Sequence, residues 1–254
     1  MLKSSTVLAV MVSLLATAPL AARQDSSPRR IVAMLAHPDD ELPLAPALAA
    51  LARQGDFVTI IHATPGDAGP GVSGLAPGLQ LAEARRAEAE CAAAALGAAV
   101  VGNLGFGDGQ LSDQARASAR QPESLAAAVA EHVSGADLVL SWGPDGGYGH
   151  ADHRMISAIT AQVIQSLPDE DRPVLLYFGI ATGTLPPMAE LQDWAVTDPA
   201  LLTERIAYTA EDLAAARAAT QCHATQFAPE ARAVLADLFD QTIWRGAVHF
   251  RRAF

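Results

Sequence analysis

The chain contains few cysteines, which argues against a small domain held together by several disulfides. Only two cysteines, Cys91 and Cys222, occur among 254 residues. They are too few and too far apart in sequence to make a disulfide scaffold. Neither belongs to a CxxC motif, which argues against a zinc site built from thiolates. We therefore expect both cysteines to be small core residues, with a disulfide between them as the alternative.

Aromatic residues and positive charges are also scarce. Aromatic side chains make up only 5% of the residues, whereas half of all residues are apolar. We therefore expect a core in which small residues, mainly alanine, let helices pack closely on a sheet. Seventeen basic residues stand against twenty-eight acidic ones, a net charge of −11. This balance argues against nucleic acid and anionic membrane surfaces as partners. The length suits a single domain, expected over residues 31–254.

Long apolar runs are missing except near the N-terminus. There, Lys3 precedes the apolar run 7–16, and small residues follow as far as Ala22. A basic start, a short apolar centre and an alanine-rich exit are typical of a secretory signal peptide. We expect residues 1–22 to be removed on export, residues 23–30 to be a flexible lead-in, and the mature protein to be secreted or periplasmic, without a stable membrane span. An uncleaved membrane anchor is the alternative, although the run is short for a span.

Five short apolar runs alternate with helix-like segments in the rest of the chain. The expected strands are residues 31–35, 57–63, 98–104, 136–141 and 173–178, with a short strand-like segment at 247–250. The expected helices are residues 42–51, 79–96, 122–135, a segment ending near 167, 210–225 and 229–243, with Pro122 at a first helical position. This alternation predicts an α/β sandwich of three layers, in which helices cover both faces of a mostly parallel sheet. Right-handed crossovers around the first strand give the strand order 3-2-1-4-5.

Polar side chains cluster where the first and fourth expected strands end. The hexapeptide Ala36-His37-Pro38-Asp39-Asp40-Glu41 follows the first strand, and the glycine-rich segment 143–154 follows the fourth. Alone, the hexapeptide fits a charged turn that caps the next helix equally well. In the predicted order, however, strands one and four are neighbours, so both segments meet at the carboxyl edge of the sheet. This adjacency favours one site built from both.

Histidines and carboxylates in these segments are spaced to bind a metal. His37 and Asp40 are three residues apart, and His150 and His153 repeat that spacing, so one helical turn can aim each pair at one point. Imidazole and carboxylate ligands without thiolates suit zinc, and iron or cobalt would also be acceptable. Three protein ligands would leave a position for water, and Asp39 is a candidate acceptor for its proton. The alternative is a set of helix caps and satisfied polar groups at strand ends.

The two motifs together resemble the LmbE-like or PIG-L family of zinc-dependent N-deacetylases. The resemblance rests on the hexapeptide and on Gly149-His150-Ala151-Asp152-His153-Arg154, with weaker matches around Glu88, residues 104–109 and residues 223–226. It implies a Rossmann-like fold and an exported zinc hydrolase that removes an N-acetyl or other N-acyl group. The implied substrate is a small molecule or glycan that bears an N-acetyl group, namely an amino sugar or glycoconjugate.

The resemblance also implies which residues carry the chemistry. One Zn²⁺ per chain would be bound by His37, Asp40 and His153. Asp39 would be the general base, and His150 would stabilise the oxyanion or protonate the leaving amine. An imidazole, most directly that of His150, would be oriented by Asp152.

Substrate contacts are implied for three further residues, Tyr148, Asp108 and Arg85. For Arg85, and likewise for Glu88, an ion pair on or between helices is the alternative, and Asp108 is alternatively a turn residue. The segments expected to shape the pocket are residues 64–77, which are rich in glycine and proline, and residues 179–199, which have no clean period.

The chain departs from the family's first motif after Glu41. Relatives usually continue with Glu-Leu-Gly and a pair of glycines, whereas this chain has Pro43 and Pro46. Pro46 removes a backbone donor and is expected to tighten or bend the start of the helix that Glu41 begins. The departure is expected to alter the pocket wall, so two alternatives stay open: a metallohydrolase of a non-sugar amide, and a carbohydrate-binding protein without turnover. We interpret His62 as structural and His223 as a packed or surface residue.

Overall fold

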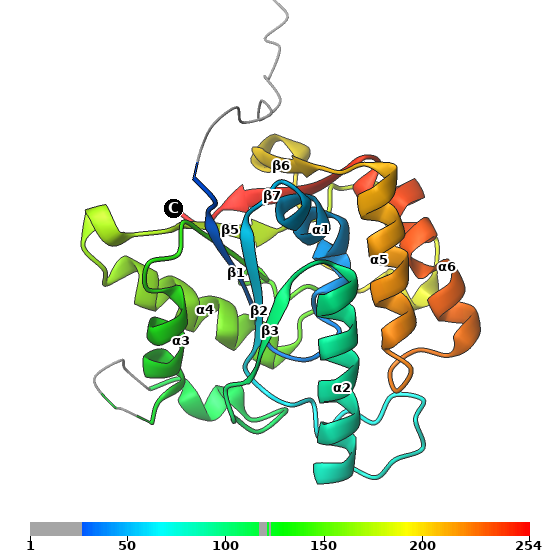
Figure 1. Cartoon of the computed structure of the whole chain (residues 1–254), viewed down its shortest axis with the longest axis horizontal. Coiled ribbons are helices and arrows are strands. Elements are labelled where there is room, and N and C mark those ends of the chain that lie inside the picture. Colours follow the sequence, from blue (N-terminus) through cyan, green and yellow to red (C-terminus); the bar gives the residue numbers. More distant parts are fainter. Residues whose placement is uncertain (1–26, 117–120, 122) are drawn as a thin grey trace, which may run out of the picture.

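A seven-stranded mixed sheet of order β3-β2-β1-β4-β5-β7-β6 forms the centre of the molecule. The computed structural model describes residues 27–116, 121 and 123–254 (Figure 1). The strands are β1 (Arg30–Leu35), β2 (Phe57–His62), β3 (Ala99–Asn103), β4 (Leu138–Ser141), β5 (Val174–Phe178), β6 (Glu204–Ala207) and β7 (Ala247–Arg252). Strands β1 to β5 are parallel, and β7 and β6 extend the sheet in antiparallel pairs beyond β5. The predicted order of the first five strands is confirmed.

Strand β6 is the element that the sequence did not predict. Only Ile206 of its four residues is buried, and it lies at the edge of the sheet. A short, polar edge strand has no apolar run, so its composition does not distinguish it from a loop.

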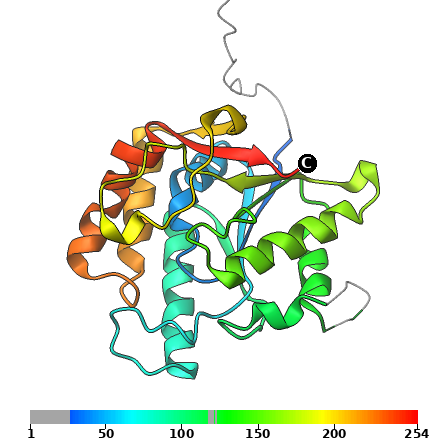
Figure 2. The same ribbon diagram turned by 180° about the vertical axis from the view of Figure 1, so that it is seen from behind.

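Helices cover both faces of the sheet, as predicted (Figures 1 and 2). One face carries α1 (Ala45–Arg53), α2 (Leu79–Ala95), α5 (Ala210–Cys222) and α6 (Pro229–Phe239), and the other carries α3 (Leu125–Val133) and α4 (Ala151–Gln165). The side chains of β1 alternate between the two layers: Ile31 packs with the first group of helices and Val32 with the second. Helix α3 begins after its N-cap Ser124, and Pro122, the expected first helical position, lies outside the described residues.

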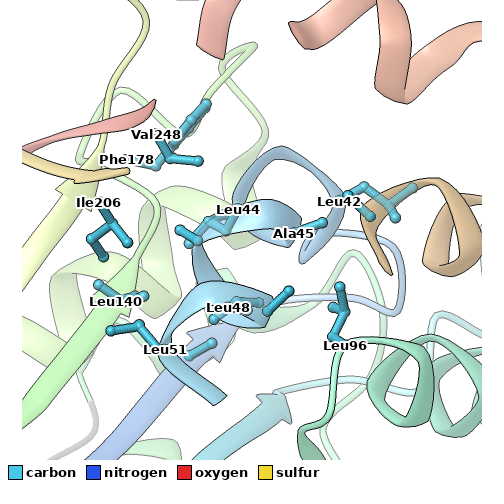
Figure 3. Packing of buried hydrophobic residues seen from close by; sticks show 14 of the residues in the cluster. Leu42, Leu44, Ala45, Leu48, Leu51, Leu96, Leu140, Phe178, Ile206 and Val248 are labelled. Atoms are coloured by element: carbon cyan, nitrogen blue, oxygen red, sulfur yellow. The ribbon is translucent and has the colours of Figure 1, made fainter. Parts of the chain in front are cut away.

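Small residues let α1 pack closely between the sheet and α5. Ala50 of α1 and Ala216 of α5 are fully buried in the same cluster as Leu48, Leu51 and Leu140 (Figure 3). The same cluster also buries five aromatic side chains, so large rings contribute more to the core than expected: Trp142, Phe178, Phe239, Trp244 and Phe250. The chain enters α1 through a 3-10 turn, Leu42–Leu44, and Pro46 occupies the first turn of the helix, where its missing donor is tolerated.

A disulfide between Cys91 and Cys222 ties α2 to α5, so the expectation of two separate core residues is wrong. The two Cα atoms lie 5.8 Å apart although 131 positions separate the residues in sequence. The pairing follows from the packing of α2 against α5 (Figure 1), a contact that the sequence did not reveal.

The residues expected to form a signal peptide, 1–22, lie outside the described residues, as do residues 23–26 of the lead-in. The folded domain begins slightly earlier than expected, because Arg29 binds Asp56 through its backbone N–H and its guanidinium, and Arg30 starts β1. Among the described residues, no helix has the length and apolar character needed to cross a membrane.

Candidate active site

The two sequence motifs meet at the carboxyl edge of the sheet, as predicted. Strand β1 pairs with β4 so that Met34 lies opposite Ser141, and the chain then turns into the hexapeptide on one side and the segment 142–150 on the other. The hexapeptide turn is closed by the Asp40 carboxylate, whose Oδ2 accepts the backbone N–H groups of Ala36 and His37, each at 2.9 Å. Asp40 is therefore held by hydrogen bonds within its own turn, independently of the segment after β4.

Three side chains that can bind a metal, His37, Asp40 and His153, lie next to one another between these segments. His153 Nε2 lies 3.3 Å from His37 Nδ1 and 3.0 Å from Asp40 Oδ1, and His37 Nδ1 lies 3.7 Å from Asp40 Oδ2. Ligand atoms at the usual bond length from a tetrahedral zinc ion are about 3.3 Å apart. All three side chains are buried. Among the described residues, two sets of side chains have ligand atoms within 4.8 Å of one another: His37 with His150 and His153, and His37 with Asp108 and Asp152. The first set lies beside Asp40 Oδ1, so the donor types at this place suit a divalent cation.

The other polar atoms of two of these groups are engaged elsewhere. Asp40 uses Oδ2 to close its own turn, which leaves Oδ1 next to His153 Nε2. His153 Nδ1 lies 3.1 Å from the carbonyl oxygen of Gly146 and donates to it, so Nε2 keeps its lone pair. A second partner of this kind fixes the tautomer and the orientation of a metal-binding imidazole.

The opposite side of the His37 ring, at Nε2, faces two further carboxylates, those of Asp108 and Asp152. His37 Nε2 lies 3.0 Å from Asp108 Oδ1 and 3.3 Å from Asp152 Oδ2. Asp108 also accepts the backbone N–H of Ala68, and Asp152 accepts two backbone N–H groups of segment 109–111. Since both carboxylates are already engaged, this side serves to orient His37, and the free lone pair of its Nδ1 points to the metal side.

The pKa values describe the same site as it is without a cation. Burial disfavours charge on His37, but Asp108 and Asp152 outweigh it and raise its pKa to about 10. Burial opposes ionisation of Asp40, yet the neighbouring His153 and His37 hold its pKa well below the usual range. A proton thus occupies the His37 nitrogen that a cation would need, so metal binding there releases a proton.

His150 is half-buried and lies next to His37 and His153. It is the N-cap of α4, and its Nδ1 accepts the backbone N–H of Asp152 at 3.2 Å. Its ring centroid is 4.8 Å from that of His37 and 4.7 Å from that of His153. Burial and the two neighbouring imidazoles lower its pKa. A neutral ring whose Nδ1 accepts carries its proton on Nε2, so His150 offers one N–H donor.

The structure assigns Asp152 differently from the sequence expectation. Its carboxylate contacts His37, whereas only its backbone N–H reaches His150. The imidazole that Asp152 orients directly is therefore that of His37. The family resemblance favoured His150, but as N-cap and N2 of one helix the two residues point their side chains in different directions.

Asp39 lies beside the candidate metal ligands in an unusual backbone conformation. Its φ is 105°, in the region that glycine favours and other residues avoid. Its N–H donates to Glu41 Oε2 at 3.1 Å, and its Oδ1 lies 3.0 Å from Arg85 Nη2. Burial raises the pKa of Asp39 to about 6 although Arg85 opposes the shift. This carboxyl group can therefore exchange a proton near neutral pH.

Arg85 connects the Gly- and Pro-rich loop to the hexapeptide. Its buried guanidinium donates to the carbonyl oxygens of Gly66, Gly69 and Pro38 as well as to Asp39. Because these N–H groups already bind oxygens of the protein, Arg85 holds the hexapeptide in place. It does not form an ion pair on the surface, and it does not reach a substrate directly. The expected substrate contact of Arg85 thus has no support in this geometry.

Glu41, the last residue of the hexapeptide, points away from the candidate metal ligands and contacts two buried histidines that were not expected to be functional. The Glu41 side chain does not face solvent at a helix start; its Oε1 is 2.5 Å from His223 Nε2 and its Oε2 is 3.3 Å from His62 Nε2. Burial lowers the pKa of His223 and raises that of Glu41, but their mutual attraction reverses both shifts. The available signals were the position of Glu41 within the first motif and the weak match that begins at His223.

The neighbouring carboxylate Glu88 also has a role different from the expected ion pair. Its two oxygens accept the backbone N–H of Thr225 at 2.7 Å and the Thr225 hydroxyl at 2.6 Å. It thereby fixes the chain just after α5, close to His223.

Aromatic rings border the metal side of the site. Trp142 stacks on His153 with centroids 4.7 Å apart and planes at 6°. Tyr148 is 45% exposed, and its ring centroid lies 5.2 Å from that of His153 and 5.7 Å from that of Trp194. The segment 179–199 is therefore next to Tyr148, the expected substrate contact.

The two prolines that depart from the family motif lie in the core. Pro43 and Pro46 are buried, and the carbonyl oxygen of Pro43 accepts a hydrogen bond from Trp244 Nε1 at 2.8 Å. The departure therefore changes packing behind the site, and the expectation that it alters the pocket wall is not supported.

The chain is similar in sequence to a known protein family and to its members. The family model described as PIG-L, GlcNAc-PI de-N-acetylase, matches residues 32–164. A 1D-myo-inositol 2-acetamido-2-deoxy-alpha-D-glucopyranoside deacetylase from Rhodococcus erythropolis (strain PR4 / NBRC 100887) is 32% identical over 166 residues, which are 56% of this chain and 54% of the relative. The chain thus matches about half the length of this curated relative.

Solved structures with the same fold have different activities. The antimicrobial-reagent pseudoaglycone deacetylase Dbv21 superposes with a TM-score of 0.65 at 23% identity, covering 89% of this chain and 97% of that one. The 4-carboxy-2-hydroxymuconate hydratase GalB from Pseudomonas putida superposes with a TM-score of 0.61 at 19% identity, covering 90% of this chain and 97% of that one. These similarities confirm the three-layer fold and leave the reaction to be argued from the site.

Proposed function

Because the chain belongs to the PIG-L (GlcNAc-PI de-N-acetylase) family, we propose that it is a metal-dependent hydrolase that removes an N-acetyl group from an amino sugar or glycoconjugate. The observation that carries the proposal is the buried cluster of His37, Asp40 and His153, with Asp39 and His150 beside it. The activities named for the relative from Rhodococcus erythropolis and for Dbv21 support the choice of an N-acetylated substrate.

The proposed cofactor is one Zn²⁺ ion per chain, held by His37, Asp40 and His153. Iron or cobalt would suit the same imidazole and carboxylate donors. A cation bound there would supply a Lewis acid that polarises the amide carbonyl and lowers the pKa of a water molecule.

The chain's own residues then account for the proton transfers. Asp39 accepts a proton from the water whose oxygen forms the new bond to the acyl carbon, and gives a proton to the nitrogen as the C–N bond breaks. The products are acetate and a free amine. His150 donates from Nε2 to the carbonyl oxygen as negative charge develops on it, the role that its hydrogen bond from Asp152 allows. Of the two roles expected for His150, the geometry therefore supports stabilisation of the oxyanion.

The residues around this centre hold or contact the reacting groups. Asp108 and Asp152 keep His37 in the orientation that leaves Nδ1 free. The exposed ring of Tyr148, beside Trp194, is the proposed surface against which the sugar lies. Asp108 is too close to His37 to be assigned mainly to the substrate.

We also propose that the protein is exported. The signal-like pattern of residues 1–22 is one support. The disulfide between Cys91 and Cys222 is a second, because such bonds form and persist in oxidising compartments.

The function is tested by measuring bound metal in the purified protein and acetate released from a panel of N-acetylated amino sugars. Acetate release that stops after chelation and returns with added zinc is the expected result. Full activity after the metal is stripped would overturn the mechanism. Matched non-sugar amides belong in the same panel, since hydrolysis of those alone would leave the metal chemistry intact and reject the amino-sugar substrate.

A further inference from the structure

A fully buried group of polar side chains behind the hexapeptide takes no direct part in the proposed chemistry. Glu41, His62 and His223 are at most 2% exposed. They come from three separate places: the turn after β1, the end of β2 and the end of α5. Burying a carboxylate between two imidazoles is costly unless every contact is satisfied, so a role for this group is worth seeking.

The group is connected to Asp39 by one hydrogen bond. Glu41 Oε2, which also contacts His62, accepts the backbone N–H of Asp39 at 3.1 Å. Glu41 Oε1 is occupied by His223 at 2.5 Å. The two histidines therefore fix the carboxylate, and the carboxylate fixes the peptide unit that carries Asp39.

This peptide unit needs to be held because Asp39 has a φ of 105°. A residue with a Cβ avoids this conformation unless its surroundings enforce it. Arg85 provides the second restraint, since its Nη2 donates to the carbonyl oxygen of Pro38 and to Asp39 Oδ1. Asp39 is thus held from both sides, by an acceptor for its N–H and by a donor to the carbonyl before it.

We infer that Glu41, His62 and His223 are positioning residues that hold Asp39 in its left-handed conformation beside the metal donors. The catalytic part of this inference rests on the proposed function, because it takes Asp39 as the base. None of the three residues is hydrogen-bonded to the proposed metal-binding atoms of His37, Asp40 and His153. Their loss is therefore expected to act on turnover and to leave metal binding intact.

The first test is Glu41→Gln, which keeps the shape of the side chain but replaces one of the two acceptor oxygens by a donor. We expect the variant to retain its full metal content, and to lose about 10- to 100-fold in kcat, the usual range for a supporting residue. KM should stay within about twofold, since uniform substrate binding is untouched. Loss of the metal, or an unchanged kcat, would overturn the inference.

A double-mutant cycle separates positioning from general destabilisation. In an Asp39→Asn background, Glu41→Gln should have no further effect on kcat, because the residue through which it acts is already disabled. A role in stability alone would lower kcat by the same factor in both backgrounds. The matched control is Asp212→Asn, which removes another buried carboxylate, paired with Arg53 at 2.8 Å at the opposite end of α5. It should lower the melting temperature and leave kcat unchanged.

A stability measurement tests the inference even if the chain releases no acetate from any sugar. With Glu41 present, Asp39→Gly should melt at a higher temperature than Asp39→Ala, because only glycine accepts the enforced φ. In a Glu41→Gln background this advantage of glycine should shrink. An equal advantage in both backgrounds would overturn the inference while leaving the proposed function standing. Should Glu41→Gln fail to fold, His223→Gln, which keeps a donor near Glu41, replaces it in both arms, with His223→Leu as the variant without a donor.

Discussion

Asp40 and Glu41 are neighbours in sequence, and each carboxylate lies between two histidines from distant parts of the chain. Asp40 contacts His37 and His153, and Glu41 contacts His62 and His223. The two groups differ in what they leave free. Around Asp40, Oδ1 lies 3.0 Å from His153 Nε2, which lies 3.3 Å from His37 Nδ1, and the half-exposed His150 is next to both rings.

Around Glu41 both oxygens are occupied. Oε1 contacts His223, and Oε2 accepts from His62 and from the Asp39 N–H. The group is closed to solvent on all sides. The same residue types thus make a binding site in one place and a support in the other, and the difference lies in free lone pairs and access.

The difference between the two groups is tested most directly by removing one histidine from each. His153→Ala should abolish metal binding and lower acetate release by at least about 10³-fold, because a Lewis acid and its activated water are lost together. His223→Gln should keep the metal. Metal content by atomic emission and acetate release by a coupled assay provide the two readings. Retained metal in His153→Ala would mean that the donor set is assigned wrongly.

Removing the disulfide tests how far the group around Glu41 depends on the fixed position of His223 at the end of α5. Cys91→Ser removes the bond to Cys222, the residue before His223. Loss of such a long-range cross-link typically costs about 2–5 kcal/mol, which for a domain of this size corresponds to a fall of roughly 4–20 °C in Tm. Calorimetry of Cys91→Ser and Cys222→Ser should give equal losses, while metal content stays at the wild-type value. Unequal losses would indicate that one cysteine has a separate packing role.

The carboxylates on the far side of His37 should have a smaller effect. Asp152→Asn removes an acceptor from His37 Nε2, so the ring is less firmly held in the tautomer that leaves Nδ1 free. The metal affinity is expected to fall about 10- to 100-fold, the range for partners of a metal-binding histidine. Competition with a fluorescent chelator measures it. Asp108→Asn, on the same nitrogen, is the matched variant, and complete loss of metal in either would place a carboxylate among the ligands.

The pH dependence of stability should show the smallest difference. The pKa of His223 is raised in the folded protein and that of Glu41 is lowered, in both cases by their contact. His223 therefore stabilises the fold below its unfolded pKa, and this contribution is lost as the pH rises through its folded pKa. Glu41 stabilises the fold above its unfolded pKa and loses this contribution as the pH falls.

The stabilising effect of the pair should thus be greatest between about pH 4.5 and 6.5, the ordinary pKa values of the two groups. Urea unfolding of the metal-free wild type and of metal-free His223→Gln gives the measurement. The difference between their unfolding free energies should narrow at high pH. A constant difference would show that His223 is uncharged throughout.

The sequence was sufficient to predict the arrangement that brings the candidate metal ligands together. Hydrophobic runs gave the five parallel strands, and the crossover rule placed the ends of β1 and β4 together, which brings His37 and Asp40 next to His153. These predictions succeed because each depends on local pattern plus one general rule of chain topology.

Contacts between helices and the choice of side-chain rotamers were not predictable in the same way. The sequence did not reveal that α2 lies against α5, so the disulfide was only the alternative and the approach of His223 to Glu41 was not foreseen. It also assigned Asp152 to the wrong imidazole, since that choice depends on side-chain direction at a helix start. Such features follow from the packed structure and have no period in the sequence.

The stacking of Trp142 on His153 has an optical consequence. The indole face lies parallel to the imidazole at a centroid distance of 4.7 Å, and Trp142 is almost fully buried. The electron-rich face of an indole favours positive charge on a neighbouring ring, so a change in the charge of His153 should alter the emission of this tryptophan. The chain has only three tryptophans, and Trp244 lies in the core, where it donates to Pro43. If zinc binds as proposed, titration of the metal-free protein should change the intrinsic fluorescence, and Trp142→Phe should reduce that change, since Trp194 also lies near the site.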